Sequence, residues 1–246
     1  MHELITETAG RTTSLRNQPL LERRDVQTTA VLLMSGDRGL AGAFNASVLR
    51  RSLEEAAAER AQGRGIVWYA AGRKGAGSLR FRGADPRHVW TGFTDRPVYA
   101  DAEQIAHQLI EDYTEGAFDR LVIVFNHFDS AIVQTVYAEE ILPIPLPARL
   151  VEMSPRDRAL MGELLFEPEA EEMLTPLLTT ALESEIYRAL LESTASEHGA
   201  RMNAMRSASD NAADLIERLT LDMNRARQAE ITQQLLEVVA GADALS

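Results

Sequence analysis

Three glycines stand between an apolar run and a helical pattern, a position where α/β proteins often bind phosphate. They are Gly36, Gly39 and Gly42, in the order Gly-x-x-Gly-x-x-Gly. Dinucleotide-binding proteins carry Gly-x-Gly-x-x-Gly instead, and no Gly-Lys-Ser or Gly-Lys-Thr follows here as it does in a P-loop. Asp37, inside the loop, would also repel a phosphate. These residues favour a tight structural turn over a nucleotide site.

A second candidate for chemistry is His127 with Asp129, which directly follow the clearest apolar run of the chain. An α/β protein often keeps catalytic groups at the end of a strand, but no nucleophile or acid–base pair is recognisable beside these two. The histidines show no metal-ligand spacing. We therefore predict no catalytic residue, no cofactor-binding residue and no metal site.

Apolar runs alternate with helical patterns between residues 28 and 142. We expect strands over 28–35, 66–70, 88–94, 121–126 and 135–142. Helices are expected over 43–62 and 100–115, with a short helix or loop in the glycine-rich segment 72–83. Such alternation implies right-handed crossovers and a mostly parallel sheet. The prediction is an α/β, Rossmann-like domain over residues 25–167.

Residues 169–242 are typical of one long helix, with nothing obvious in the chain for it to pack against. About 70 helical residues would span on the order of 100 Å, whereas a domain built from the rest is roughly 30–40 Å across. We expect most of the helix to project from its domain. A heptad seam runs along it, formed by Met202, Met205, Ser209, Ala212, Ile216, Leu219, Met223 and Ala226.

An exposed apolar seam needs a cover, so the pattern predicts a partner helix, a partner protein, or both. Beyond Ala226 the apolar residues spread around the helix, which is typical of a buried helix. We therefore expect the tip to enter a sleeve made by other subunits. Gly199, inside the helix, is either neutral variation or a point where another backbone comes close.

Composition narrows the class of protein. The 246 residues carry a formal net charge of -12, which disfavours nucleic-acid binding through phosphate neutralisation. The absence of cysteine excludes disulfides and thiolate catalysis. The sequence has neither an apolar window of transmembrane length nor a signal peptide, so we expect a cytoplasmic protein.

Three stretches resemble the gamma subunit of the F-type ATP synthase, the central rotor shaft. Residues 35–45, Ser-Gly-Asp-Arg-Gly-Leu-Ala-Gly-Ala-Phe-Asn, are similar to the family's Ser-Asp-Arg-Gly-Leu-x-Gly-x-x-Asn loop with Gly36 added. The other two are 186–205 and 219–245, and the latter contains the family's C-terminal signature. Gln234 stands where that signature has Glu. The family begins with a long helix antiparallel to the last one, so we expect residues 1–24 to be its remnant with a linker.

The resemblance implies a non-catalytic subunit of a proton-transporting enzyme. Its α/β domain would sit with the epsilon subunit on the ring of c subunits, at the cytoplasmic face of the bacterial cell membrane. Residues 168–246 would form half of an antiparallel coiled coil inside a hexamer of alpha and beta subunits. The polar contacts with beta implied at matching positions are Arg225, Arg227, Gln228, Thr232 and Glu237.

The same resemblance assigns the Asp37-Arg38-Gly39 loop a structural role. It also implies that the core of the coiled coil is formed by Met202, Met205, Ala212, Ile216, Leu219 and Met223. The alternative hypothesis is a free-standing α/β nucleotide-binding protein with a helical dimerisation tail, which would need a measurable nucleotide affinity.

Overall fold

The computed structural model describes residues 18–145 and 170–243. The chain divides into two compact units, Met1–Arg201 and Met202–Ser246, which are described separately. The predicted helix remnant at residues 1–16 and the predicted boundary at residue 168 both lie outside the described residues. The domain limits drawn from the sequence therefore stay predictions.

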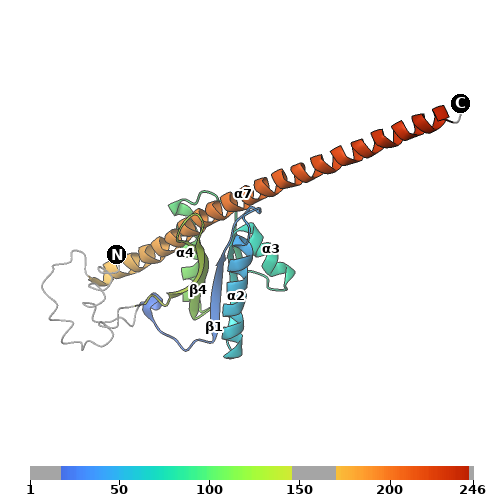
Figure 1. The fold of residues 1–246 in the computed structure, drawn as a ribbon. Coiled ribbons are helices and arrows are strands. Elements are labelled where there is room, and N and C mark those ends of the chain that lie inside the picture. Colours follow the sequence, from blue (N-terminus) through green and yellow to red (C-terminus); the bar gives the residue numbers. More distant parts are fainter. Residues whose placement is uncertain (1–17, 146–169, 244–246) are drawn as a thin grey trace. The chain divides into compact units, whose positions relative to one another are not determined.

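A five-stranded sheet forms the centre of the described part of the first unit (Figure 1). Its strand order is β3-β2-β1-β4-β5. The β1, β2, β3 and β4 strands run parallel, and β5 pairs antiparallel with β4. The predicted sheet is confirmed, although β3 is shorter than expected. The strands are β1 (Thr28–Met34), β2 (Gly65–Ala71), β3 (His88–Trp90), β4 (Arg120–Phe128) and β5 (Gln134–Leu142).

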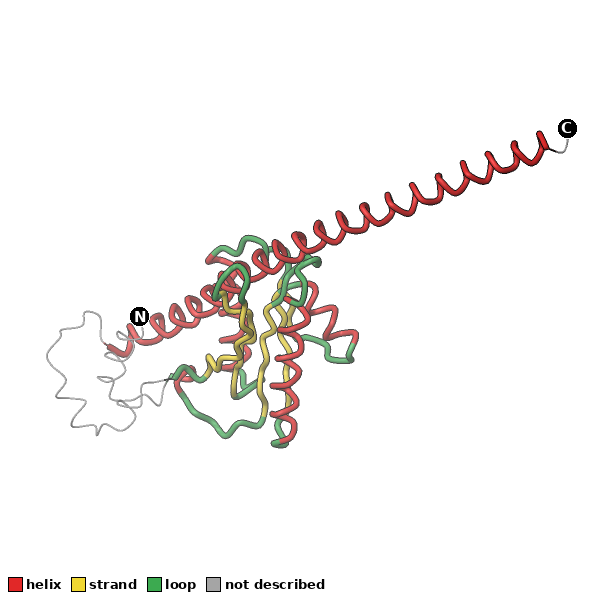
Figure 2. The backbone as a smooth tube through the Cα atoms, viewed as in Figure 1, coloured by secondary structure: helices red, strands yellow, loops and turns green. Residues whose placement is uncertain are grey.

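Helices cover both faces of this sheet, as the tube in Figure 2 shows. Successive side chains of a strand point to opposite faces. Accordingly, Val31 and Leu33 of β1 pack in the cluster that contains α2 and α3 residues, while Leu32 packs with α4 and α7. Residues 29–34 are all buried, as expected for a strand covered on both faces. The helices are α2 (Phe44–Ala61), α3 (Arg73–Phe81), α4 (Tyr99–Thr114) and α7 (Ala170–Asp243).

The first part of α7 belongs to the core of the first unit. Leu174, Leu178, Leu182 and Ile186 are spaced four residues apart, and each is at most 2% exposed. Burying a side chain of this size contributes about 1.5–3 kcal/mol, so this stripe holds the helix firmly on the sheet. The expectation that the helix has nothing in its own chain to pack against is therefore wrong for residues 174–201.

The described residues of the second unit are a continuation of α7. In the single chain Asn203 and Ala204 are half-buried, and residues 205–238 are exposed. In the described ranges, no helix combines the length and apolar character that a membrane crossing requires.

Candidate functional site: the Asp37 loop, the α7 junction and the α7 seam

The Asp37 carboxylate joins three segments at the carboxyl edge of the parallel strands. It accepts hydrogen bonds from the backbone amides of Arg73 (2.9 Å) and Gly92 (2.7 Å) and from the Thr94 hydroxyl (3.0 Å). Arg73 is the first residue of α3, so the negative charge sits at the positive end of that helix. The same loop is tied to α2, because the Gly36 amide donates to Asn45 Oδ1 at 2.9 Å.

This arrangement bears on the two interpretations of the glycine-rich loop. A bound phosphate would need free backbone amides at the N-terminus of a helix. Here the loop's own Gly36 and Asp37 amides already donate to the side chains of Asn45 and Thr94. The neighbouring Arg73 amide of α3 donates to Asp37, a group with the same charge sign as phosphate. The geometry supports the structural role predicted for Asp37 and gives no support to a nucleotide at this position.

Gly36 of the loop lies directly against α7. A Cβ built on it would come 2.6 Å from Oε1 of Glu197, a side chain that is buried and paired with Arg201. Nη2 of Arg201 reaches the Gly39 carbonyl oxygen at 3.5 Å. The absence of a side chain at Gly36 therefore lets the loop close on the buried Glu197 carboxylate, which is paired with the partly exposed Arg201.

Arg38 takes no part in that closure. Its side chain is 71% exposed, and its guanidinium lies 3.4 Å from the Asp95 carboxylate. All three predicted loop residues contact other elements, but Arg38 does so only through its carbonyl oxygen, which accepts a 3.3 Å hydrogen bond from Asn45 of α2, and its side chain remains at the surface.

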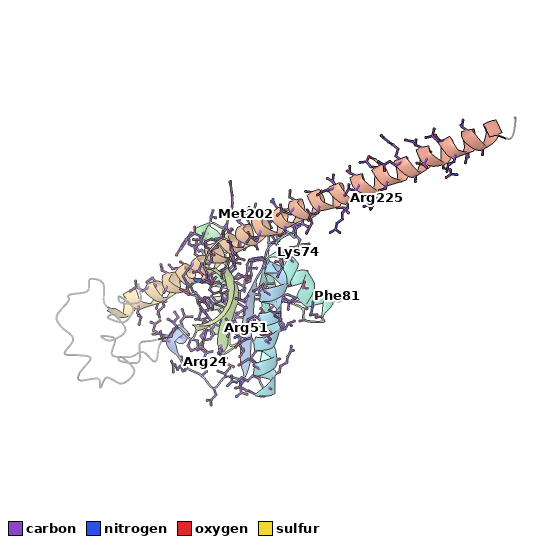
Figure 3. The ribbon with its side chains drawn as sticks, in the orientation of Figure 1. Arg24, Arg51, Lys74, Phe81, Met202 and Arg225 are labelled. Carbon is purple, nitrogen blue, oxygen red and sulfur yellow. The ribbon has the colours of Figure 1, made fainter. Side chains whose placement is uncertain are left out.

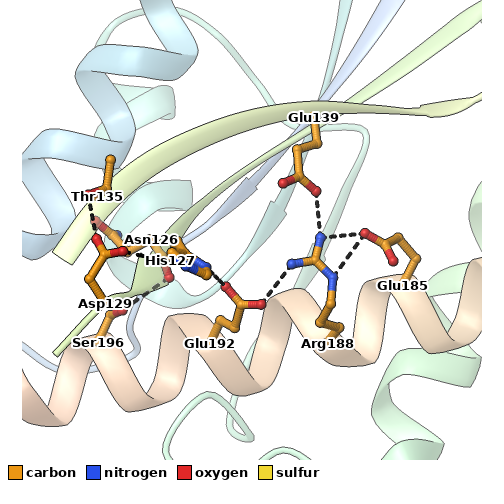
Figure 4. Close-up of polar contacts among 9 residues, drawn as sticks. All are labelled: Asn126, His127, Asp129, Thr135, Glu139, Glu185, Arg188, Glu192 and Ser196. Carbon is orange, nitrogen blue, oxygen red and sulfur yellow. Dashed lines mark hydrogen bonds and ion pairs between the residues drawn. The ribbon is translucent and has the colours of Figure 1, made fainter.

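Arg188 is the centre of the polar contact between α7 and the edge strand β5 (Figure 4). Its guanidinium donates to Glu139 of β5 at 2.5 Å, to Glu192 at 2.7 Å and to Glu185. The group also lies 5.3 Å from the Phe125 ring centre. Hydrogen bonding to Glu185 raises the pKa of Arg188 against the opposing effect of burial. A planar guanidinium suits this site, since it bonds several carboxylates at once.

His127 extends the same network rather than forming a catalytic pair. Its Nδ1 contacts the Glu192 carboxylate, and its Nε2 lies 3.6 Å from Asp129 (Figure 4). Asp129 in turn accepts a 2.6 Å hydrogen bond from Thr135. Nearby, the Ser196 hydroxyl donates to the Asn126 carbonyl oxygen at 3.1 Å. These contacts fasten the end of β4 to α7, which accounts for a histidine at this strand end.

The predicted seam lies on the second unit and is exposed. Met202, Ile216 and Met223 are 56%, 66% and 61% exposed, and Met205 and Leu219 are exposed as well. Ala212 lies on the same exposed stretch. An apolar stripe of this length is unfavourable in water, and exposed stripes of this kind are typical of surfaces that bind a partner.

The five polar residues predicted at the tip do not share one face. Arg225, Gln228 and Thr232 follow one another at intervals of three and four residues, which places them on one side of the helix. Arg227 and Glu237 fall on other sides, because a turn takes 3.6 residues. A partner would therefore have to surround the helix to contact all five.

Local contacts leave these side chains available. Arg225, labelled in Figure 3, is 79% exposed and lies 3.7 Å from Asp222. The Thr232 hydroxyl donates to the Gln228 carbonyl oxygen at 2.8 Å, within its own helix. Glu237 accepts a 3.1 Å hydrogen bond from Gln233.

Comparison with known proteins gives the family. The ATP synthase family model matches residues 1–245. The ATP synthase gamma chain of Streptomyces avermitilis is 43% identical over 248 positions, which cover 97% of this chain and 80% of that relative. The gamma chain of Moorella thermoacetica is 42% identical, covering 93% and 77%. The chain belongs to the ATP synthase gamma-chain family. The predicted resemblance to the gamma-subunit family is confirmed.

Solved structures agree with this membership. A chain of the Tetrahymena thermophila mitochondrial ATP synthase central stalk and c-ring is 27% identical, with a TM-score of 0.59, over 84% of this chain and 95% of that one. A chain of the Euglena gracilis mitochondrial ATP synthase shares the fold at 19% identity, with a TM-score of 0.65, over 99% and 84%. The predicted fold class, a mostly parallel sheet domain with a long C-terminal helix, is confirmed.

Proposed function

We propose that this gamma chain is the central-stalk subunit of a proton-translocating F-type ATP synthase. It rotates inside a hexamer of alternating alpha and beta subunits and couples proton flow to ATP synthesis at the beta sites. The observation that carries the proposal is the exposed apolar seam of α7 in a chain 43% identical to gamma chains. The Tetrahymena relative, 27% identical, comes from a central stalk.

The seam and the tip have separate roles in this proposal. Met202, Ile216 and Met223, with the rest of the seam, pair with an antiparallel helix to make a coiled coil of two helices. The tip residues contact loops of the beta subunits. Arg225 and Arg227 suit contacts that must form and break at each step, because an exposed guanidinium binds carboxylates without being buried.

The remaining partners are the epsilon subunit and the c-subunit ring. The α/β domain would stand on the ring, so that association with the membrane is indirect and peripheral, at the cytoplasmic face of the bacterial cell membrane. We assign residues 1–24 to the coiled coil and its linker, 25–167 to the α/β domain and 168–246 to the shaft. No contact with nucleic acid is proposed for a chain of net charge -12.

The subunit itself performs no bond chemistry in this proposal, although it belongs to a multisubunit enzyme. The support is that the polar groups considered as candidates for chemistry make structural contacts instead. Asp37 holds the loop, and His127 holds α7. The alternative of a free-standing nucleotide-binding protein is not favoured by the comparisons.

The test is assembly with alpha and beta subunits. Replacing both Leu219 and Met223 by Asp puts two charges into the seam and should reduce recovery of the complex at least tenfold. Leu221→Asp is the matched control, because it changes an exposed leucine outside the seam. Normal assembly of the Leu219→Asp/Met223→Asp chain would refute the assigned role of the seam.

A further inference from the structure

Three side chains that can bind a metal come together between α4 and α7, away from the loop and the seam. Glu103 and His107 stand four residues apart on α4 and so project from one face of that helix. Glu183 comes from the part of α7 that packs on the sheet. Nε2 of His107 lies 3.6 Å from Oε1 of Glu183 and 4.0 Å from Oε1 of Glu103. One donor atom from each residue lies within 4.8 Å of the other two.

Glu183 supplies an observation that an exposed acidic patch would lack. Its side chain is only 9% exposed. Oε2 accepts a 2.6 Å hydrogen bond from the Tyr99 hydroxyl, while Oε1 faces His107. Among the described residues no hydrogen-bond donor reaches Oε1, and no Lys or Arg side chain pairs with Glu103 or Glu183. A buried carboxylate without a permanent counter-charge is costly, and the neighbouring His107 is charged only when protonated, so this position favours a cation.

The donor set indicates the class of cation. Imidazole nitrogen and carboxylate oxygen are both donors that zinc and other divalent first-row metals accept. Bond lengths of about 2.1 Å place tetrahedral zinc ligands roughly 3.4 Å apart. The two spacings that involve His107, 3.6 and 4.0 Å, therefore need only small adjustments, and the two carboxylates, within 4.8 Å of each other, must draw closer. Glu103 and His107 are 52% and 61% exposed, which leaves them free to make these adjustments.

We propose that Glu103, His107 and Glu183 bind one divalent transition-metal ion, with Zn²⁺ as the representative, and that water completes the coordination. The Tyr99 hydroxyl orients the buried carboxylate, as outer-shell partners of metal ligands do. The ion fastens α4 to the docked part of α7. Sequence spacing missed the site, because its third ligand comes from a distant helix.

The experiment is a calorimetric titration of the full chain with ZnCl₂ after chelator treatment. The expected result is one ion per chain, at micromolar or tighter affinity. His107→Gln should weaken that affinity at least tenfold, and Glu183→Gln should do the same. His198→Gln is the matched control, since His198 is an exposed histidine of α7 that faces Asp95. The Zn²⁺ affinity of the His198→Gln chain should equal that of the unmodified chain.

A second readout tests the link between the two helices. Saturating Zn²⁺ should raise the unfolding midpoint of the unmodified chain by several degrees and leave that of His107→Gln unchanged. Because His107 is exposed, this variant should fold normally, which circular dichroism would verify. The absence of Zn²⁺ binding would overturn the proposal. So would binding that survives His107→Gln but is lost in His127→Gln, since the ion would then sit beside Asp129 and Glu192.

Discussion

Gly199 of α7 packs against the backbone of Ala131 in the turn between β4 and β5. A Cβ built on the glycine would lie 3.1 Å from the Ala131 carbonyl oxygen and 3.3 Å from Nε2 of Gln134. The sequence left two explanations for a glycine inside this helix, neutral variation and close approach of another backbone. The structure supports the second explanation. The helix accepts a residue of poor helix propensity where a turn docks on it.

This contact predicts the response to larger side chains. Alanine normally stabilises a helix interior by about 1 kcal/mol relative to glycine. Gly199→Ala should gain less than that, because the turn must move. Gly199→Val should lower the free energy of unfolding by about 2 kcal/mol through overpacking. Urea denaturation measures both, with Ser207→Ala as the exposed helical control. A full 1 kcal/mol gain for Gly199→Ala would contradict the close approach.

Asp37 is expected to stabilise the loop rather than to bind a ligand. Asp37→Ala leaves the amides of Arg73 and Gly92 without their acceptor, and hydrogen bonds to a charged group contribute about 1.5–3 kcal/mol each in protected sites. Since these bonds are exposed, we expect a loss of about 2 kcal/mol in total. Asp37→Asn, which keeps one acceptor oxygen, should lose less. Equal stability of Asp37→Ala together with new ATP binding would reverse this assignment.

Arg188 should contribute through its geometry as well as through its charge. Arg188→Met removes the cation shared by Glu139, Glu185 and Glu192, and we expect a loss of about 2 kcal/mol in unfolding free energy. Arg188→Lys keeps the charge but loses the planar guanidinium, so its unfolding free energy should lie between those of the unmodified chain and Arg188→Met. Chemical denaturation at low and high salt checks the order. A lysine variant as stable as the original would show that charge alone suffices.

The pKa of Asp112 leads to a prediction of how the free energy of unfolding depends on pH. Burial by itself would raise the pKa of Asp112, but hydrogen bonds from Tyr69 (2.5 Å) and Arg87 (3.1 Å) outweigh it and hold the pKa below its ordinary value. The stabilisation is therefore complete above about pH 4 and is lost as the pH falls through the lowered pKa. Asp112→Asn should flatten this acid limb of the stability curve.

The control for that experiment is Glu111→Gln, on the exposed side of the same helix. It should keep the acid dependence of the unmodified chain. If the stability of Asp112→Asn fell with pH as steeply as that of the unmodified chain, Asp112 would not be the cause of the acid dependence.

The sequence predicted most of the sheet because continuous apolar runs such as 121–126 have few other uses in a domain of this size. It did not predict that residues 174–201 of the last helix belong to the core. Leu174, Leu178 and Leu182 recur every four residues, which is the pattern of a helix that docks on a sheet, but the heptad seam further along masks this signal.

Polar contacts were less accessible from the sequence. Arg188 was noticed only as part of a stretch similar to the gamma family, because its partner Glu139 lies on a distant strand. From the sequence, Gly36 was only an addition to a loop. The structure shows why a glycine fits there, because a Cβ at this position would collide with the Glu197 carboxylate. Both cases depend on which elements the fold brings together, and neither residue spacing nor composition carries that information.

Rotation is the measurement that tests the central claim most directly. The chain has no cysteine, so Phe81→Cys, at a position 89% exposed on α3, would allow one bead to be attached to the α/β domain. In a complex with alpha and beta subunits fixed to a surface, the account predicts steady rotation of the bead in one direction while ATP is present. Rotation should stop when ATP is removed. A bead that stays still in an assembled complex with active ATP hydrolysis would contradict the account.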